Sequence, residues 1–157
     1  MHLIHGYLGV GKTTFSRRLE LERNAVRFSA DEWYIRLFAG DQPTAHLDAE
    51  LWRRMMSLLN DLWPVLAARG VDVILDFGFW NRPARDEARR LAGLAGADVR
   101  VYEVVCEEVV ARGRCASRNA DASASFFIDR AAFDDLLSMF QPLEPDEPAE
   151  RVDTTRS

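Results

Sequence analysis

The chain has 157 residues, of which 48% are apolar and 29% charged, a balance typical of one globular domain with a substantial core. A formal net charge of −5 argues against a general nucleic-acid-binding surface, and no apolar run approaches the roughly 18 residues that span a bilayer. The start lacks the basic leader and apolar stretch of a signal peptide, and Cys106 and Cys115 make no disulfide framework, so we expect a cytoplasmic protein that does not bind membranes.

Short apolar runs alternate with longer amphipathic stretches along the chain. This alternation predicts βαβ units around a mainly parallel sheet, in a single domain over residues 1–157. Strands are expected at His2–His5, Ala25–Phe28, Val71–Asp76, Val99–Val105 and Arg151–Thr154. Helices are expected at about residues 12–22, 31–39, 47–69, 83–95, 107–118 and 129–139.

The first expected strand leads into Gly6-Tyr-Leu-Gly-Val-Gly-Lys-Thr13, which satisfies the Walker A pattern in full. The glycines let successive backbone N–H groups face phosphates, Lys12 reaches the β- and γ-phosphate oxygens, and the Thr13 hydroxyl can bind Mg²⁺. Lys12 is also the only lysine among the twenty basic residues. The motif predicts a nucleoside triphosphate site, for ATP in the first place, made by Gly6, Gly9, Val10, Gly11, Lys12, Thr13 and Thr14.

A carboxylate, Asp31, follows the second expected strand in Ser29-Ala-Asp-Glu32. These four residues form a capping-box pattern, in which Asp31 favours the first turn of a helix. The second strand also ends on the phosphate side of a parallel sheet, where a general base for phosphoryl transfer must stand. The two interpretations are compatible, because Ser29 can cap the helix while Asp31 acts as the base.

The third expected helix is long and contains Pro64, which predicts a kink or two shorter helices. Trp52 and Trp63 follow its apolar positions and are expected in the core. The next strand ends at Asp76, where P-loop proteins hold Mg²⁺, often through water. We therefore expect Thr13 and Asp76 to form the metal site; a helix-capping or loop role for Asp76, with Asp31 as the metal carboxylate, is the alternative.

Three arginines, Arg112, Arg114 and Arg118, lie on the fifth expected helix, before a small and polar segment at 119–125. Arginines on a lid over about residues 112–127 could neutralise charge on a transferring phosphoryl group. The alternative is a solvated basic face that pairs with Glu107 or Glu108. Further along, prolines at every third position make residues 141–148 an extended, acidic connector.

With these motifs in place, the chain resembles P-loop kinases of the nucleoside-kinase-like group. It is most similar to the kinase domain of bacteriophage-type polynucleotide kinase and to small bacterial antibiotic or small-molecule phosphotransferases. The resemblance implies that Asp31 is the general base and that Asp76 serves the metal. It also implies that Arg118 assists transfer and Arg114 contacts nucleotide phosphate. Asn81-Arg-Pro83 resembles the start of the family's next helix.

Two departures from the polynucleotide kinases concern the acceptor. Tyr34 stands where they carry an arginine for the acceptor's phosphate, and the bulky Phe77-Gly-Phe-Trp80 replaces a short loop. Phe77, Phe79 and Trp80 either pack under the lid helix or line a cleft. In the second case Trp80 covers a ring-bearing or apolar acceptor, with polar contacts from Asn81 and Arg82.

The sequence as a whole predicts a three-layer α/β P-loop fold with a five-stranded parallel sheet in the order 2-3-1-4-5 and an arginine-bearing lid. The predicted function is an ATP- and Mg²⁺-dependent kinase that moves the γ-phosphoryl group to a hydroxyl, with Asp31, Lys12 and Arg118 as catalytic residues. A small-molecule acceptor is favoured. The 5′-hydroxyl of RNA or DNA is one alternative, and a nucleotide-dependent switch or ATPase without an acceptor is another.

Overall fold

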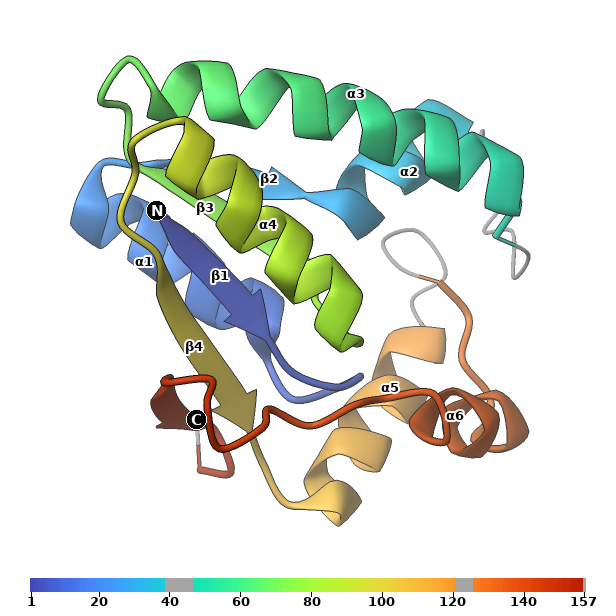
Figure 1. Ribbon diagram of the computed structural model, residues 1–157. Coiled ribbons are helices and arrows are strands. Elements are labelled where there is room, and N and C mark those ends of the chain that lie inside the picture. The colour runs from blue at the N-terminus through green and yellow to red at the C-terminus, as the bar shows by residue number, and fades with distance from the viewer. Residues whose placement is uncertain (39–46, 121–125, 157) are drawn as a thin grey trace.

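Five parallel strands form the centre of the computed structural model, which describes residues 1–38, 47–120 and 126–156 (Figure 1). The strands are β1 (His2–His5), β2 (Val26–Ser29), β3 (Val73–Gly78), β4 (Arg100–Val105) and β5 (Glu150–Asp153). They lie in the order β2-β3-β1-β4-β5, and every neighbouring pair is parallel. The predicted fold and strand order are confirmed.

Six helices connect the strands within the described residues. They are α1 (Lys12–Arg23), α2 (Ala30–Phe38), α3 (Ala49–Ala67), α4 (Arg82–Leu94), α5 (Glu108–Ala120) and α6 (Arg130–Leu137). Residue 39 of the second predicted helix and residues 121–125 of the predicted lid lie outside the described ranges. No helix that the structure describes is long and apolar enough to cross a membrane.

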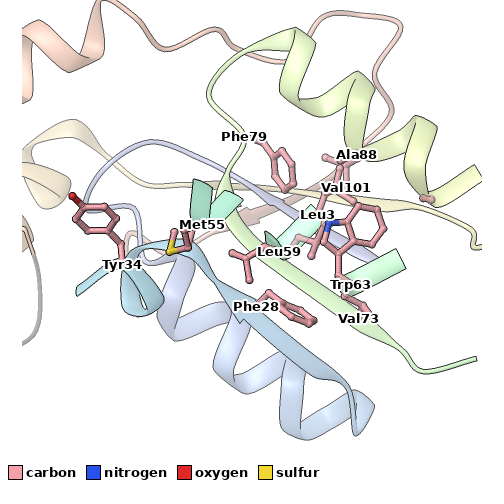
Figure 2. Close-up of a cluster of buried hydrophobic side chains, with 13 residues drawn as sticks. Leu3, Phe28, Tyr34, Met55, Leu59, Trp63, Val73, Phe79, Ala88 and Val101 are labelled. Carbon is pink, nitrogen blue, oxygen red and sulfur yellow. The ribbon is translucent and has the colours of Figure 1, made fainter. Parts of the chain in front are cut away.

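Side chains at alternating strand positions build one core on each face of the sheet. Leu3 and Val73 point to the face covered by α3 and α4, where they meet Leu59 and the fully buried Trp63 (Figure 2), and Leu75 belongs to the same core. The opposite core contains Ile4, Phe15, Leu19, Ile74, Tyr102, Val104, Ala111 and Phe133, from β1, β3 and β4 and from α1, α5 and α6. The sheet is therefore the middle of three layers, because its central strands bury both faces.

Polar side chains begin several helices. The Asp48 carboxylate accepts hydrogen bonds from two backbone N–H groups at the start of α3, and Asn81 does the same for one at the start of α4. The capping box predicted for α2 is not formed in this way, because Glu32 pairs with Arg17 and Arg27 instead.

Pro64 lies inside α3, near its end, and the helix runs unbroken to Ala67 (Figure 1). The prediction of two shorter helices is wrong. A proline removes only one backbone donor, and only the final turn follows it, so little helix remains to be broken. The neighbouring Trp63 is buried as expected, and its indole N–H donates to the Asn60 side chain at 3.0 Å.

Candidate active site

The Walker A residues form a tight loop between β1 and α1. Gly9 and Gly11 adopt φ angles of 72° and 91°, in the left-handed region that favours glycine. A Cβ on Gly9 would lie 2.3 Å from the Ala111 carbonyl oxygen, and one on Gly6 would lie 2.5 Å from that of Val104. The loop is thus pressed against β4 and α5, which explains why no larger residue fits at these positions.

The Lys12 ammonium folds back over this loop and donates to the Tyr7 carbonyl oxygen at 2.6 Å. Burial lowers the pKa of Lys12, and the nearby carboxylates of Asp76 and Asp31 counteract that effect. The contact holds the charge of Lys12 at the loop. Phosphate oxygens bound by the loop would offer this ammonium a stronger, charged acceptor than a carbonyl.

A cleft of about 740 Å³ opens beside the loop. Four P-loop residues, Asp31 and two of the three predicted arginines lie on its walls, whereas Lys12 and Asp76 do not line it. The lining residues are Leu8, Gly9, Gly11, Thr13, Thr14, Arg17, Ser29, Asp31, Glu32, Ile35, Val110, Gly113, Arg114, Ser117, Arg118, Phe126 and Ile128. Gly6 and Val10 are buried behind this surface.

Asp31 stands in the first turn of α2 and is open to solvent in the cleft. In the part of the chain that the structure describes, its carboxylate makes no hydrogen bond or ion pair. Desolvation of the carboxylate by the surrounding protein raises the pKa of Asp31, while the positive charges of Lys12 and Arg118 act to lower it. An available carboxylate with a raised pKa is suited to accept a proton from a hydroxyl.

Asp76 lies in a different environment from that of Asp31. It is buried, and its Oδ2 accepts hydrogen bonds from Ser16 Oγ at 2.8 Å and from Arg27 Nη1 at 3.2 Å. Asp76 does not line the cleft, whereas Thr13 does. Among the described residues no three His, Cys, Asp or Glu side chains gather as a metal site. The Thr13 hydroxyl on the cleft wall fits Mg²⁺, which keeps several waters and takes its remaining ligands from phosphates, while the Asp76 carboxylate is held by Ser16 and Arg27.

The three arginines of α5 take different positions. Arg118 is exposed on the cleft wall, and its Nη2 lies 3.2 Å from Cys115 Sγ. Arg114 also lines the cleft, but it donates to the Thr154 hydroxyl and carbonyl oxygens at 3.1 and 2.7 Å. Arg112 pairs with Glu108, as the alternative interpretation predicted, and also with Asp134, which it did not predict.

The Phe77–Trp80 segment does not line the cleft. Phe79 is 5% exposed in the core beside α4 (Figure 2), and the Trp80 ring lies 5.5 Å from that of Tyr7 in the opposite core. Asn81 caps α4, and Arg82 binds Asp86 and acidic residues of the 141–148 segment. The structure thus agrees with the packing alternative for Phe79 and Trp80, while Asn81 and Arg82 are engaged with other parts of the protein and do not line the cleft.

Sequence reasoning missed the charged network below the cleft. Arg27, on β2, is only 9% exposed at its side chain and forms ion pairs with Glu20, Glu32 and Asp76. Burial alone would raise the pKa of Glu32, but hydrogen bonds from Arg27 and Arg17 lower it. An arginine within an apolar strand is the signal that could have indicated this network, since such a charge requires partners.

Comparisons with known proteins agree with this architecture. A family model described as an AAA domain matches residues 1–143. A search of the curated proteins gives no match.

Several solved structures share the fold. A provisionally assigned kinase from Chloroflexus aurantiacus j-10-fl has a TM-score of 0.76 and 21% identity, over 99% of this chain and 88% of that one. A sugar kinase from Janibacter sp. HTCC2649 has a TM-score of 0.66 and 23% identity, over 97% and 83%. A chain of the Pnkp1/Rnl/Hen1 RNA repair complex has a TM-score of 0.70 and 21% identity, over 88% and 42%. At such identities the likeness shows the P-loop fold alone.

Proposed function

The chain belongs to the AAA domain family, and from this premise we propose that it is an ATP- and Mg²⁺-dependent kinase that phosphorylates a hydroxyl of a small molecule. The observation that carries the proposal is the shared cleft. P-loop residues, the carboxylate of Asp31 and the guanidinium of Arg118 line one space. A nucleotide-binding module needs the loop, but it needs neither an available base nor an arginine opposite that base.

The proposed reaction assigns one task to each group. Asp31 accepts the proton of the acceptor hydroxyl as its oxygen attacks the γ-phosphorus and the bond to the ADP oxygen breaks. Lys12 leaves the Tyr7 carbonyl and binds β- and γ-phosphate oxygens, while Arg118 offsets charge on the transferring group. Thr13 and, through water, Asp76 would hold Mg²⁺, which supplies charge neutralisation at the phosphates. Arg114 would reach nucleotide phosphate only by leaving or sharing Thr154.

The wall formed by α2 favours a small acceptor with an apolar face. Ile35 and Phe126 line the cleft beside Asp31, and Phe126 lies 5.7 Å from the ring of Tyr34. Tyr34 is itself buried, and its hydroxyl accepts a hydrogen bond from Asp48 N at 2.7 Å, so it offers no charge to an acceptor's phosphate. Arg17, from α1, also lines the cleft and is engaged with Glu32 of α2 at 2.9 Å.

A 5′-hydroxyl polynucleotide is the second candidate acceptor. The likeness to a chain of an RNA repair complex supports the fold that such a reaction needs. Arg17, on α1, lines the cleft together with Asp31 and would meet the acceptor's phosphate on leaving Glu32. A lid over residues 112–127 and a cytoplasmic location, where ATP and Mg²⁺ are available, belong to the same proposal.

The nucleotide half of the proposal has a direct test, since Lys12 is the only lysine. An amine-reactive reagent can modify only Lys12 and the amino terminus, which lies apart at Asp72 and serves as an internal control. Mg²⁺–ATP should slow modification of Lys12 by about tenfold or more and leave the amino terminus unchanged. Equal modification of Lys12 with and without ATP would contradict a phosphate site at this loop.

A further inference from the structure

A buried ion pair joins α4 to the acidic 141–148 segment, away from the cleft. Arg85 is fully buried and Glu147 is 6% exposed. The guanidinium binds both carboxylate oxygens, with Nε–Oε1 at 2.8 Å and Nη2–Oε2 at 2.7 Å. Arg85 also donates to the carbonyl oxygens of Gln141 and Pro142, at 3.1 and 3.3 Å. The paired geometry fixes the plane of the guanidinium.

The same guanidinium reaches the loop between β3 and α4. Arg85 Nη1 donates to the Phe79 carbonyl oxygen at 3.1 Å, and His5 Nδ1 lies 3.1 Å from that oxygen as a second donor. Phe79 has a φ of 49°, in the left-handed region that a bulky residue rarely adopts. Such a conformation persists only where its surroundings hold it, and here two buried donors converge on its carbonyl.

The residues on either side of Phe79 lie against the phosphate loop. Gly6 N donates to the Gly78 carbonyl at 3.3 Å, and a Cβ on Gly78 would lie 3.6 Å from Lys12 Cε. Trp80 packs on Tyr7, whose carbonyl holds the Lys12 ammonium. A shift of the Phe79 backbone would therefore also move Gly78 and Trp80, which pack against Lys12 and Tyr7.

We propose that Arg85 is a positioning residue for nucleotide binding, which acts by fixing the Phe79 carbonyl and so the Gly78–Trp80 backbone behind Lys12. Arg85 does not line the cleft and contacts no reacting group. The inference rests on the proposed function, since it assumes that Lys12 binds the phosphates of ATP. It gives the acidic segment a role as the support that holds Arg85 in place through Glu147.

A double variant separates this role from simple stability. Arg85→Met with Glu147→Met replaces the ion pair by apolar side chains, an exchange that often leaves stability near that of the wild type. The double variant nevertheless removes the Arg85 guanidinium that donates to the Phe79 carbonyl oxygen. Arg89→Met is the matched control, because Arg89 belongs to the same helix and pairs with the same carboxylate at 2.7 Å but does not bind Phe79. Thermal unfolding without nucleotide and calorimetric titration with Mg²⁺–ATP are the two measurements.

The double variant should lose some thermal stability, because the Gln141 and Pro142 carbonyls lose their donor. At a temperature where it is fully folded it should bind ATP about tenfold more weakly, while Arg89→Met should bind ATP like the wild type. Wild-type ATP affinity in the double variant would overturn the proposal. If the double variant does not fold, Arg85→Lys decides, since it keeps a positive charge beside Glu147 but loses the planar fork that reaches Glu147 and the Phe79 carbonyl at once. At a temperature where it is folded, this variant should bind ATP several-fold more weakly than the wild type, and wild-type affinity would overturn the proposal. A wild-type protein that binds no ATP would instead refute the proposed function.

Discussion

Replacing Asp31 by asparagine should separate catalysis from binding. The amide is nearly isosteric with the carboxylate, and Asp31 makes no hydrogen bond or ion pair among the described residues, so the free energy of unfolding should change by only about 0.5 kcal/mol. Removing a negative charge beside Lys12 and Arg118 should leave the affinity for ATP equal or slightly stronger. The variant cannot accept the acceptor's proton, so transfer should slow by about 10²- to 10⁴-fold.

That loss corresponds to about 2.7–5.5 kcal/mol of transition-state stabilisation. The assay is ADP release at saturating ATP and acceptor, beside calorimetric ATP titration. In the wild type, the base must be ionised, so activity should fall toward acid at a higher pH than an ordinary carboxylate would give, because the pKa of Asp31 is raised. Glu32→Gln is the matched control: this neighbouring carboxylate is held by Arg17 and Arg27, and its loss should affect stability more than transfer. Transfer by Asp31→Asn within about threefold of the wild type would refute the assignment of the base and direct attention to Glu32 or Asp76.

Three further predictions follow from the same geometry. Lys12→Ala should weaken ATP binding by about 100-fold or more in a calorimetric titration, since no other lysine exists to replace it, and unchanged affinity would contradict the motif assignment. Trp80→Ala should cost about 3 kcal/mol in urea unfolding, because the indole packs on Tyr7 outside the cleft; a stable variant would contradict this packing. Burial lowers the pKa of His5 to about 4. Between about pH 6.5 and 4 this imidazole is therefore protonated in the unfolded chain but not in the folded protein, and the free energy of unfolding falls as the pH falls through that window. His5→Asn, whose amide can still donate to Phe79, should remove up to about 1.4 kcal/mol per pH unit of that fall in urea unfolding at several pH values, and an unchanged slope would contradict the assignment.

Local and periodic patterns made the fold predictable from the sequence. The alternation of apolar runs with amphipathic stretches placed β1 at its observed bounds and the other strands close to theirs. The Walker A spacing needs no distant partner, because its glycines, Lys12 and Thr13 act within one turn. Asp31 could be placed at this cleft because the carboxyl ends of parallel strands meet at one edge of the sheet, whereas Arg118, near the end of α5, was expected there from the resemblance to the kinases.

Long-range pairing decided what the sequence could not predict. Arg85 and Glu147 are 62 positions apart, and neither lies in a motif, so nothing local indicates that they bury each other's charge. The position of Trp80 stayed open between packing and a cleft for a related reason. An aromatic residue that follows a strand can line a cleft or pack in a core. Trp80 packs because Tyr7, from a distant part of the sequence, lies beside its ring.

Transfer of phosphate to a hydroxyl is the central claim, and it can be measured with ATP labelled at the γ-phosphate. The protein and Asp31→Asn would be incubated in parallel with Mg²⁺ and labelled ATP. Each would be offered a panel of small ring-bearing alcohols and sugars and, separately, 5′-hydroxyl oligonucleotides. The account predicts a labelled, acceptor-dependent phosphate ester from a small molecule with the wild type and a much slower reaction with the variant. Label on the oligonucleotide alone would contradict the small-molecule acceptor. Persistent ATP binding with label released only as inorganic phosphate, or not at all, would contradict the kinase itself.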